Sequence, residues 1–212
     1  MRRKKGKLVI ISGFSGVGKG TVVKELLDKH QDEYVLSISM TTRAPRDGEQ
    51  EGVNYYYVSD EQFEDMIEND GFLEHAGYVG HYYGTPKKLV TDSLNKGKNV
   101  VLEIEVQGAL QVKEKYPESI MIFIIPPSAR ELKNRLVGRG SETPEQIEGR
   151  LKRAGQEAGQ MEHYDYLVVN DIVEKCAERI HEITQTKPDL ADDRKEVIRL
   201  MQEDVNNFLL ED

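Results

Sequence analysis

The chain has 212 residues, enough for one α/β domain with a substantial core and one or two insertions. Its formal net charge of −9 argues against nonspecific attraction to nucleic acid or to an anionic membrane surface. The single cysteine, Cys176, excludes an internal disulfide and a multi-cysteine metal site, as is typical of a reducing compartment. The longest apolar run, Ile120–Ile125, is too short to span a bilayer, and no signal peptide precedes the first strand. We therefore expect a soluble cytoplasmic protein.

A glycine-rich stretch near the N-terminus separates a predicted strand from a predicted helix. The strand, Leu8–Ile11, is short, apolar and β-branched, and the helix shows apolar residues at helical spacing from Val22 to Leu27. A turn of this kind points backbone N–H groups inward, and the helix N-terminus adds partial positive charge, so the turn binds phosphate. Lys19 would reach the terminal phosphates of a nucleoside triphosphate. The loop comprises Gly13, Phe14, Ser15, Gly16, Val17, Gly18, Lys19, Gly20 and Thr21.

The motif departs from its usual form at one position. A Ser or Thr ordinarily follows the lysine directly, whereas here Gly20 intervenes and Thr21 carries the hydroxyl. We therefore predict phosphate binding, with Mg²⁺ held mainly by the phosphates. Thr21 and Glu103 are the two alternative candidates for a protein ligand of the Mg²⁺ ion.

The next part of the chain interrupts the alternation of strands and helices. A strand over Tyr34–Ser39 is followed by a polar segment, Met40–Glu49, that carries Arg43 and Arg46. The following pattern predicts strands at Asn54–Val58, Phe72–Tyr78 and His81–Tyr83, a helix after the capping box Ser59–Gln62, and a helix ending near Lys96. We interpret this block as a small inserted subdomain.

The alternation resumes with a strand at Asn99–Ile104, where Glu103 and Glu105 would share one face. A continuous apolar strand follows at Ser119–Ile125. The capping box Ser128–Glu131 opens a helix.

Three arginines, a glycine-containing loop and a second helix follow that capping box. The helix begins at Thr143-Pro144, and the arrangement suggests a mobile lid. Arg135 and Arg139 lie one helical turn apart and could bind one anion together, and Arg150 follows on the next helix.

The chain ends with a strand at Tyr166–Val169, a helix to about Gln185 with Cys176 on its apolar side, and a helical tail. The apolar face of the tail, which must dock on the core or on a partner, comprises Val197, Leu200, Met201, Val205 and Phe208. Strand–loop–helix units joined by crossovers predict an α/β fold, a three-layer arrangement of a parallel sheet with helices on both faces.

Several motifs together resemble the guanylate kinase family over about residues 7–185. Besides the phosphate loop, they are Ser39–Arg46, Asn54-Tyr55, Phe72–Ala76, Tyr82–Thr85, Leu102–Gly108, Arg135–Gly140 and Val169–Asp171. The resemblance implies transfer of the γ-phosphoryl group of ATP to GMP, with Mg²⁺, in guanine nucleotide metabolism. ATP and GMP would be the partners, with no nucleic acid or membrane, and the choice between monomer and homodimer stays open.

The resemblance also implies roles for individual residues. Arg43, Arg46, Tyr55 and Tyr83 would bind the GMP phosphate, and Ser39, Glu74, Thr85 and Glu105 would contact the guanine. Arg135, Arg139 and Arg150 would bind the ATP phosphates, and with Lys19 and Arg43 they form the expected catalytic set. Asn170 would lie near the adenine. Glu105 stands where the family commonly has Asp.

The resemblance implies a domain over residues 1–186 and an acidic helical tail over 187–212. Within the domain, we expect a core at 1–38, 97–127 and 163–186, a GMP-binding subdomain at 39–96 and a lid at 128–162. Three other classes share some of these features: an inactive protein-interaction module of the same fold, a small GTPase, and a kinase for another nucleoside monophosphate. The intact loop with Lys19 disfavours the first, and the missing N-K-x-D signature disfavours the second.

Overall fold

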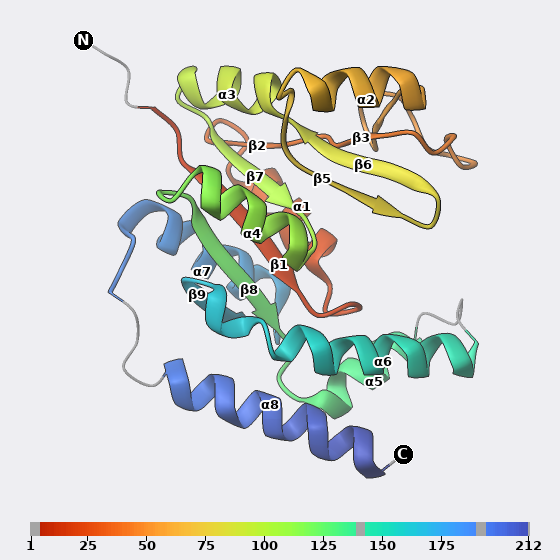
Figure 1. The fold of residues 1–212 in the computed structure, drawn as a ribbon. Coiled ribbons are helices and arrows are strands. Elements are labelled where there is room, and N and C mark those ends of the chain that lie inside the picture. The colour runs from red at the N-terminus through yellow and green to blue at the C-terminus, as the bar shows by residue number, and fades with distance from the viewer. Residues whose placement is uncertain (1–4, 139–142, 190–193, 212) are drawn as a thin grey trace. The chain divides into compact units, whose positions relative to one another are not determined.

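The computed structural model describes residues 5–138, 143–189 and 194–211, with the side chains of 209–211 left undescribed. The chain forms two compact units, one from residues 1–10 and 30–119 and the other from 11–29 and 120–212. Hydrogen bonds order five strands as β2-β7-β1-β8-β9, and β1 (Leu8–Gly13) contributes residues to both units. The pairs β2–β7 and β8–β9 are parallel, as expected for an α/β fold (Figure 1).

The first unit contains strands of the five-stranded sheet and a separate four-stranded sheet of order β4-β3-β6-β5. β5 is an edge strand of this second sheet and pairs antiparallel with β6. The elements of the unit are β2 (Tyr34–Leu36), β3 (Met40–Thr41), β4 (Tyr56–Tyr57), α2 (Asp60–Glu68), β5 (Phe72–Tyr78), β6 (His81–Pro86), α3 (Lys87–Asn95), β7 (Asn99–Glu103) and α4 (Val106–Lys115).

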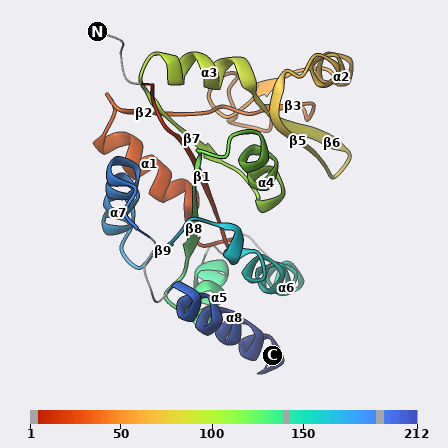
Figure 2. The same ribbon diagram turned by 60° about the vertical axis from the view of Figure 1, so that its left-hand side comes forward.

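In the second unit, helices pack around β8, whose six residues are all buried. α1 packs against α7, and α8 lies beside α5 and α6 (Figure 2). The elements are α1 (Lys19–Lys29), β8 (Ile120–Ile125), α5 (Ala129–Gly138), α6 (Pro144–Ala158), a short 3₁₀ helix (Met161–His163), β9 (Tyr166–Val169), α7 (Val173–Thr186) and α8 (Arg194–Glu211). No helix within the described ranges is both long and apolar enough to cross a membrane.

The predicted helix starts are confirmed where a capping box was recognised. The Ser59 side chain accepts from the Gln62 N–H and the Gln62 side chain accepts from the Ser59 N–H, which fixes the start of α2. Thr143 and Gln146 form the same reciprocal pair at the start of α6, with Pro144 in the first turn. The strands predicted at Phe72–Tyr78 and Tyr166–Val169 also have those bounds.

Other predicted elements differ from the structure. The strand expected at Asn54–Val58 shrinks to β4, and the sequence analysis proposed no helix where α4 lies. The prediction that Glu103 and Glu105 share a strand face is wrong, because β7 ends at Glu103 and Glu105 is the N-cap residue of α4.

The C-terminal helix packs on its own unit through a face close to the predicted one. Ile198, Met201 and Val205 are buried, whereas Leu200, which was expected on this face, is 51% exposed. The Asp204 carboxylate accepts the N–H of Ala129 at the start of α5, over 2.6 Å. This bond satisfies a backbone donor that a helix start leaves without an intrahelical partner.

Cys176 lies in the core of the second unit, as predicted. It is 1% exposed on α7, and burial raises the pKa of its thiol to about 12. Because the thiolate is the reactive form, this cysteine is chemically inert in the folded protein.

The turn between β5 and β6 holds a valine in an unfavourable backbone conformation. Tyr78 pairs with His81, so Val79 and Gly80 form a two-residue hairpin turn, and both have positive φ, +49° and +77°. Such turns favour Asn-Gly, since a β-branched residue is strained in this region. Val79 is 78% exposed and forms no core contact that would offset the strain.

We expect Val79→Asn to stabilise the protein by about 1 kcal/mol, because Asn tolerates the left-handed conformation. The melting temperature should rise by roughly 2–4 °C. Val53→Asn is the matched control, because Val53 is 60% exposed and is not among the residues with positive φ. Thermal unfolding of the three proteins checks this, and an equal change in both variants would contradict it.

Candidate active site

The glycine-rich loop lies between the end of β1 at Gly13 and the start of α1 at Lys19. Gly16 and Gly18 have φ of +92° and +95°, which side chains other than glycine's rarely tolerate. Space is also restricted: a Cβ on Gly16 would lie 2.4 Å from the Leu136 side chain, and one on Gly18 would lie 3.0 Å from Asn170 Nδ2. The glycines are therefore needed for the loop's conformation and for its packing.

Lys19 is turned back onto its own loop. Its Nζ donates hydrogen bonds to the carbonyl oxygens of Gly13, at 2.8 Å, and Phe14, at 3.3 Å. The ammonium group is thus held at the loop, at the N-terminus of α1, where the helix dipole also favours an anion. Gly20 and Thr21 follow in the first turn of α1 and are exposed.

Two side chains from other elements hold the loop from outside by binding the carbonyl oxygen of Val17. Asn170, at the end of β9, donates from Nδ2 over 2.8 Å, and Arg135, on α5, donates from Nη1 over 3.2 Å. Asn170 is 3% exposed, and its Oδ1 is buried without a hydrogen-bond partner among the described residues. The Val17 carbonyl is therefore satisfied by two protein donors from other elements.

The helix α6 contacts the loop at Ser15 through two residues of opposite charge. Arg150 Nη1 donates to Ser15 Oγ over 3.2 Å, and Glu157 Oε2 accepts from the Ser15 N–H over 3.1 Å. Glu157 is 7% exposed and was missed by sequence reasoning. The sequence pattern could have identified it, because Glu157 is a carboxylate on the same helix face as Leu151 and Ala154, a face that is otherwise apolar.

The structure thus brings Lys19, Arg135, Arg150 and Asn170 to one loop. Arg139, the remaining predicted arginine of this set, lies outside the described residues.

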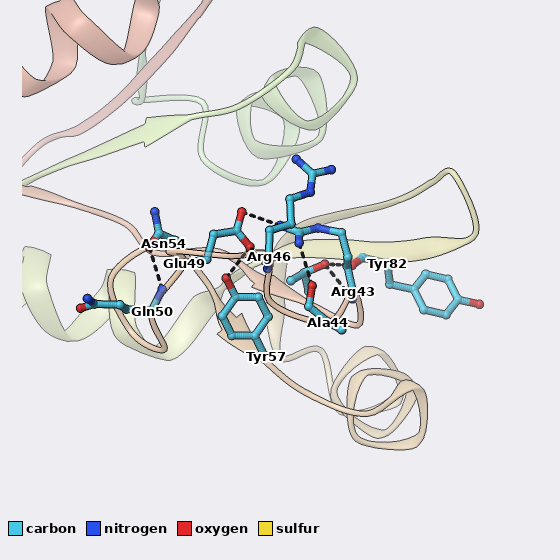
Figure 3. Close-up of polar contacts among 9 residues, drawn as sticks. Arg43, Ala44, Arg46, Glu49, Gln50, Asn54, Tyr57 and Tyr82 are labelled. Atoms are coloured by element: carbon cyan, nitrogen blue, oxygen red, sulfur yellow. Dashed lines mark hydrogen bonds and ion pairs between the residues drawn. The ribbon is translucent and has the colours of Figure 1, made fainter. Parts of the chain in front are cut away.

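In the first unit, the predicted phosphate-binding arginines lie in a loop organised by one carboxylate, Glu49 (Figure 3). Glu49 Oε1 pairs with Arg43 Nη2 at 2.9 Å, and Oε2 accepts from the Arg46 N–H at 2.8 Å and the Tyr57 hydroxyl at 2.9 Å. These contacts, the Arg46 N–H first among them, lower the pKa of Glu49. Sequence reasoning gave Glu49 no role, because its partners converge only in the folded loop.

Arg43 is positioned by its neighbours, but one of its donors has no acceptor among the described residues. Its guanidinium carbon lies 5.5 Å above the Tyr55 ring, and its Nε is buried without a hydrogen-bond partner in the described structure. Tyr55 also meets Tyr83 edge-on, with ring centroids 5.9 Å apart. Arg46 is exposed. The structure therefore brings Arg43, Tyr55 and Tyr83 of the predicted phosphate-binding set together.

A second buried carboxylate lies in an irregular part of β5. Phe72 pairs with Pro86 and His75 with Gly84, so two residues of β5, Leu73 and Glu74, oppose the single residue Thr85 of β6. A β-bulge of this kind redirects side chains, and bulges are frequent next to active sites.

Glu74 is 6% exposed, and its Oε1 accepts the Thr85 hydroxyl at 2.5 Å. Desolvation by burial raises the pKa of Glu74, while the hydrogen bonds from Thr85 and the charge of Lys115 act in the opposite direction. Glu74 and Thr85, both predicted to contact a base, are thus buried and hydrogen-bonded to each other.

Two further predicted residues lie at the ends of neighbouring elements. Ser39 is half-buried between β2 and β3, and its carbonyl oxygen accepts from the Tyr56 N–H at 2.9 Å. Glu105 is exposed at the start of α4 and caps it without a side-chain hydrogen bond.

A glycine-rich loop with a lysine at the following helix, in a parallel α/β fold, defines a P-loop nucleotide-binding protein. Comparison with known proteins identifies the family. The family model for guanylate kinase matches residues 5–187. A guanylate kinase of Bacillus cereus is 54% identical over 183 residues, covering 86% of this chain and 89% of the relative. One of Clostridium tetani is 50% identical, covering 95% and 96%.

A crystal structure of guanylate kinase from Anaplasma phagocytophilum superposes with a TM-score of 0.69 at 35% sequence identity, covering 100% of both chains. This chain belongs to the guanylate kinase family. The match confirms the predicted α/β P-loop fold.

The raised pKa of Glu74 predicts a characteristic pH dependence of stability. Between the ordinary glutamate pKa, about 4.3, and the raised value, the folded protein binds more protons than the unfolded chain. Stability contributed by Glu74 should therefore fall as pH rises through this window and level off above it. Glu74→Gln lacks the titrating group, so the wild-type free energy of unfolding minus that of Glu74→Gln should decrease across the window.

Denaturant unfolding at a series of pH values measures this difference. Glu68→Gln, an exposed carboxylate of α2 in the same unit, is the control for the loss of one negative charge. A difference that stays flat or increases with pH would show that the Glu74 carboxyl is not desolvated.

Proposed function

We propose that this chain transfers the γ-phosphoryl group of ATP to GMP, giving ADP and GDP. The observation that carries the proposal is the intact phosphate loop with Lys19 at its mouth, in a member of the guanylate kinase family. A protein-interaction module of the same fold would have no need to keep the loop lysine and the arginines around it. Guanylate kinases are nucleoside monophosphate kinases, so an enzymatic role also agrees with the family.

The loop and its neighbours suit the triphosphate of ATP. Lys19, now bonded to the carbonyls of Gly13 and Phe14, would exchange them for phosphate oxygens, which carry more negative charge. Arg135 and Arg150 already touch the loop and would add positive charge at the phosphates, and we assign Arg139 the same role. The buried amide oxygen of Asn170 has no partner among the residues that the structure describes, and we propose that it accepts from the adenine amino group.

The residues present fit a Mg²⁺ ion that is held mainly by the triphosphate. Thr21 offers an exposed hydroxyl in the first turn after the loop, and Glu103 is the alternative candidate, exposed at the end of β7. When bound, the ion would supply positive charge that neutralises the negative charge of the phosphates.

The cluster in the first unit suits the phosphate of GMP. Within the described part of the chain, the buried Nε–H of Arg43 has no acceptor, and the tyrosines beside it carry hydroxyl donors. A phosphate there would satisfy the donor, with Arg46 adding a second positive charge. We propose that Arg43, Arg46, Tyr55 and Tyr83 bind the GMP phosphate and orient its oxygen as the nucleophile.

The buried Glu74 carboxylate is an acceptor that matches the donors of guanine. Guanine presents N1–H and N2–H₂ donors side by side, which one carboxylate can accept together. Adenine has no N1–H and would place a lone pair against the carboxylate. We propose that Glu74 reads these donors and that Thr85, Ser39 and Glu105 supply further contacts to the base.

The protein contributes no nucleophile to this reaction. An oxygen of the GMP phosphate attacks the γ-phosphorus, the bond to the bridging oxygen breaks, and ADP leaves. Because both substrates are anionic, catalysis consists mostly of aligning them and neutralising the charge that they bring together. Lys19 and the arginines perform both tasks.

A coupled assay of ADP formation with ATP and each of GMP, dGMP, AMP, CMP and UMP tests the function. We expect turnover with GMP and little with AMP, CMP or UMP, because those bases lack guanine's paired donors. Absence of turnover with every acceptor would refute the enzymatic role, and a preference for another base would refute the substrate.

Lys19→Ala should lower kcat by ~10² or more, since removing one preorganised donor to the transition state typically costs ~3–4 kcal/mol. The melting temperature should stay nearly unchanged, because the two lost hydrogen bonds are only partly buried and water can replace them. Lys24→Ala removes an exposed lysine from the same helix and should retain wild-type kcat. Near-wild-type turnover by Lys19→Ala would show that the lysine does not act on the transferred group.

A further inference from the structure

One face of α4 supports the strand that carries Glu74. Gly108, Gln111 and Lys115 are three and four residues apart, so they lie on the same side of the helix. Each lies against a different part of β5: Gly108 against the Glu74 side chain, Gln111 against the His75 backbone, and Lys115 against the Phe72 carbonyl at 3.3 Å. We call these three residues the α4 platform. Family resemblance gave none of them a role.

Gly108 leaves the space that the Glu74 carboxylate occupies. A Cβ built on Gly108 would lie 2.7 Å from Glu74 Oε2, a distance that real Cβ atoms essentially never show, and 3.1 Å from Cδ. Gly108 is buried within a regular helix and is not among the glycines with positive φ. The reason for a glycine here is therefore the room it gives to Glu74, and not its backbone conformation.

Glu74 has little freedom to move elsewhere. One oxygen is bonded to Thr85 at 2.5 Å, the other faces Gly108, and the side chain is 6% exposed. Gly108 also belongs to the first turn of α4, where backbone N–H groups lack intrahelical partners and favour a nearby negative charge. The position of the carboxylate is thus set by Thr85 on one side and by the start of α4 on the other.

Gln111 binds the backbone of β5 along the edge that has no neighbouring strand in its sheet. Its Oε1 accepts the His75 N–H and its Nε2 donates to the His75 carbonyl, both over 3.3 Å. β5 is the edge strand of its sheet, so these backbone groups would otherwise have no partner strand. The amide therefore pairs with the residue next to Glu74 as a neighbouring strand would.

We propose that the α4 platform determines base selection, with Gly108 as a positioning residue that holds Glu74 where it can accept from both guanine donors. The proposal rests on the function proposed above. A methyl group at position 108 would displace the carboxylate and misalign it with N1–H and N2–H₂, while ATP binding in the other unit would keep its own contacts.

Gly108→Ala tests this without weakening the helix, since alanine is the better helix former by about 1 kcal/mol. We expect kcat/KM for GMP to fall by about 10- to 100-fold, the effect of a displacement of roughly 1 Å, with the KM for ATP nearly unchanged. The preference for GMP over AMP should narrow. Gly77→Ala is the matched control: it adds the same methyl group to β5, where nothing lies within 4 Å, and it should behave as the wild type.

A double-mutant cycle with Glu74→Gln identifies how Gly108 acts. Glu74→Gln should itself lower kcat/KM for GMP by roughly 5- to 150-fold, because an amide donor would face guanine's donors. If Gly108 acts through Glu74, adding Gly108→Ala to that variant should cost much less than it costs in the wild type. Fully additive losses, or wild-type selectivity in Gly108→Ala, would overturn the inference.

The outcomes separate the inference from the function on which it rests. A wild type that phosphorylates no GMP refutes the function, whereas an active wild type with an unaffected Gly108→Ala variant refutes only the platform. If Gly108→Ala is poorly folded, Gln111→Leu provides the same test, because it removes both bonds to His75. Gln111→Leu too should lower kcat/KM for GMP and leave the KM for ATP nearly unchanged, and equal kcat/KM values for GMP in the variant and the wild type would overturn the inference.

Discussion

The second unit depends on the constraint that a phosphate-binding loop imposes on its own backbone. When successive N–H groups turn inward, the carbonyl groups turn outward and need donors from elsewhere. Val17 receives them from Asn170 and Arg135, which belong to elements far apart in the sequence. Gly16 and Gly18 make the conformation possible, and their missing side chains let those elements approach. The conformation of the loop therefore depends on the positions of α5 and the end of β9, which carry Arg135 and Asn170.

In both units, carboxylates accept hydrogen bonds from groups of the predicted binding sites. Glu157 accepts a loop N–H, Glu49 fixes the arginine loop, and Glu74 lies buried in a bulge. In each case a negative group is held by donors before any substrate is present, so it need not be reorganised when a nucleotide binds. Preorganised groups of this kind contribute most to catalysis when the reaction depends on positioning charged substrates.

The sequence predicted the elements whose signals are local. The capping box at Ser59 and the proline after Thr143 predicted two helix starts, and the continuous apolar run of β8 predicted a buried strand. It did not predict α4, whose residues carry a weak apolar pattern, and it misplaced Glu105 on a strand. Local patterns fail there because α4 is stabilised by its contacts with β5, which no short window of sequence contains.

For the site, the sequence by itself determined which residue types are present and in what order: the loop glycines, Lys19, the arginines and Glu74 belong to recognisable motifs. Only the tertiary structure decided which of them meet, and it added Glu157 and Glu49, which belong to no local motif that sequence reasoning used. It also placed Gly108 against Glu74. The sequence could not show this contact, because a glycine has no side chain whose type would indicate its neighbour. A motif records which groups a segment carries, whereas hydrogen-bond partners and steric room depend on segments brought together by folding.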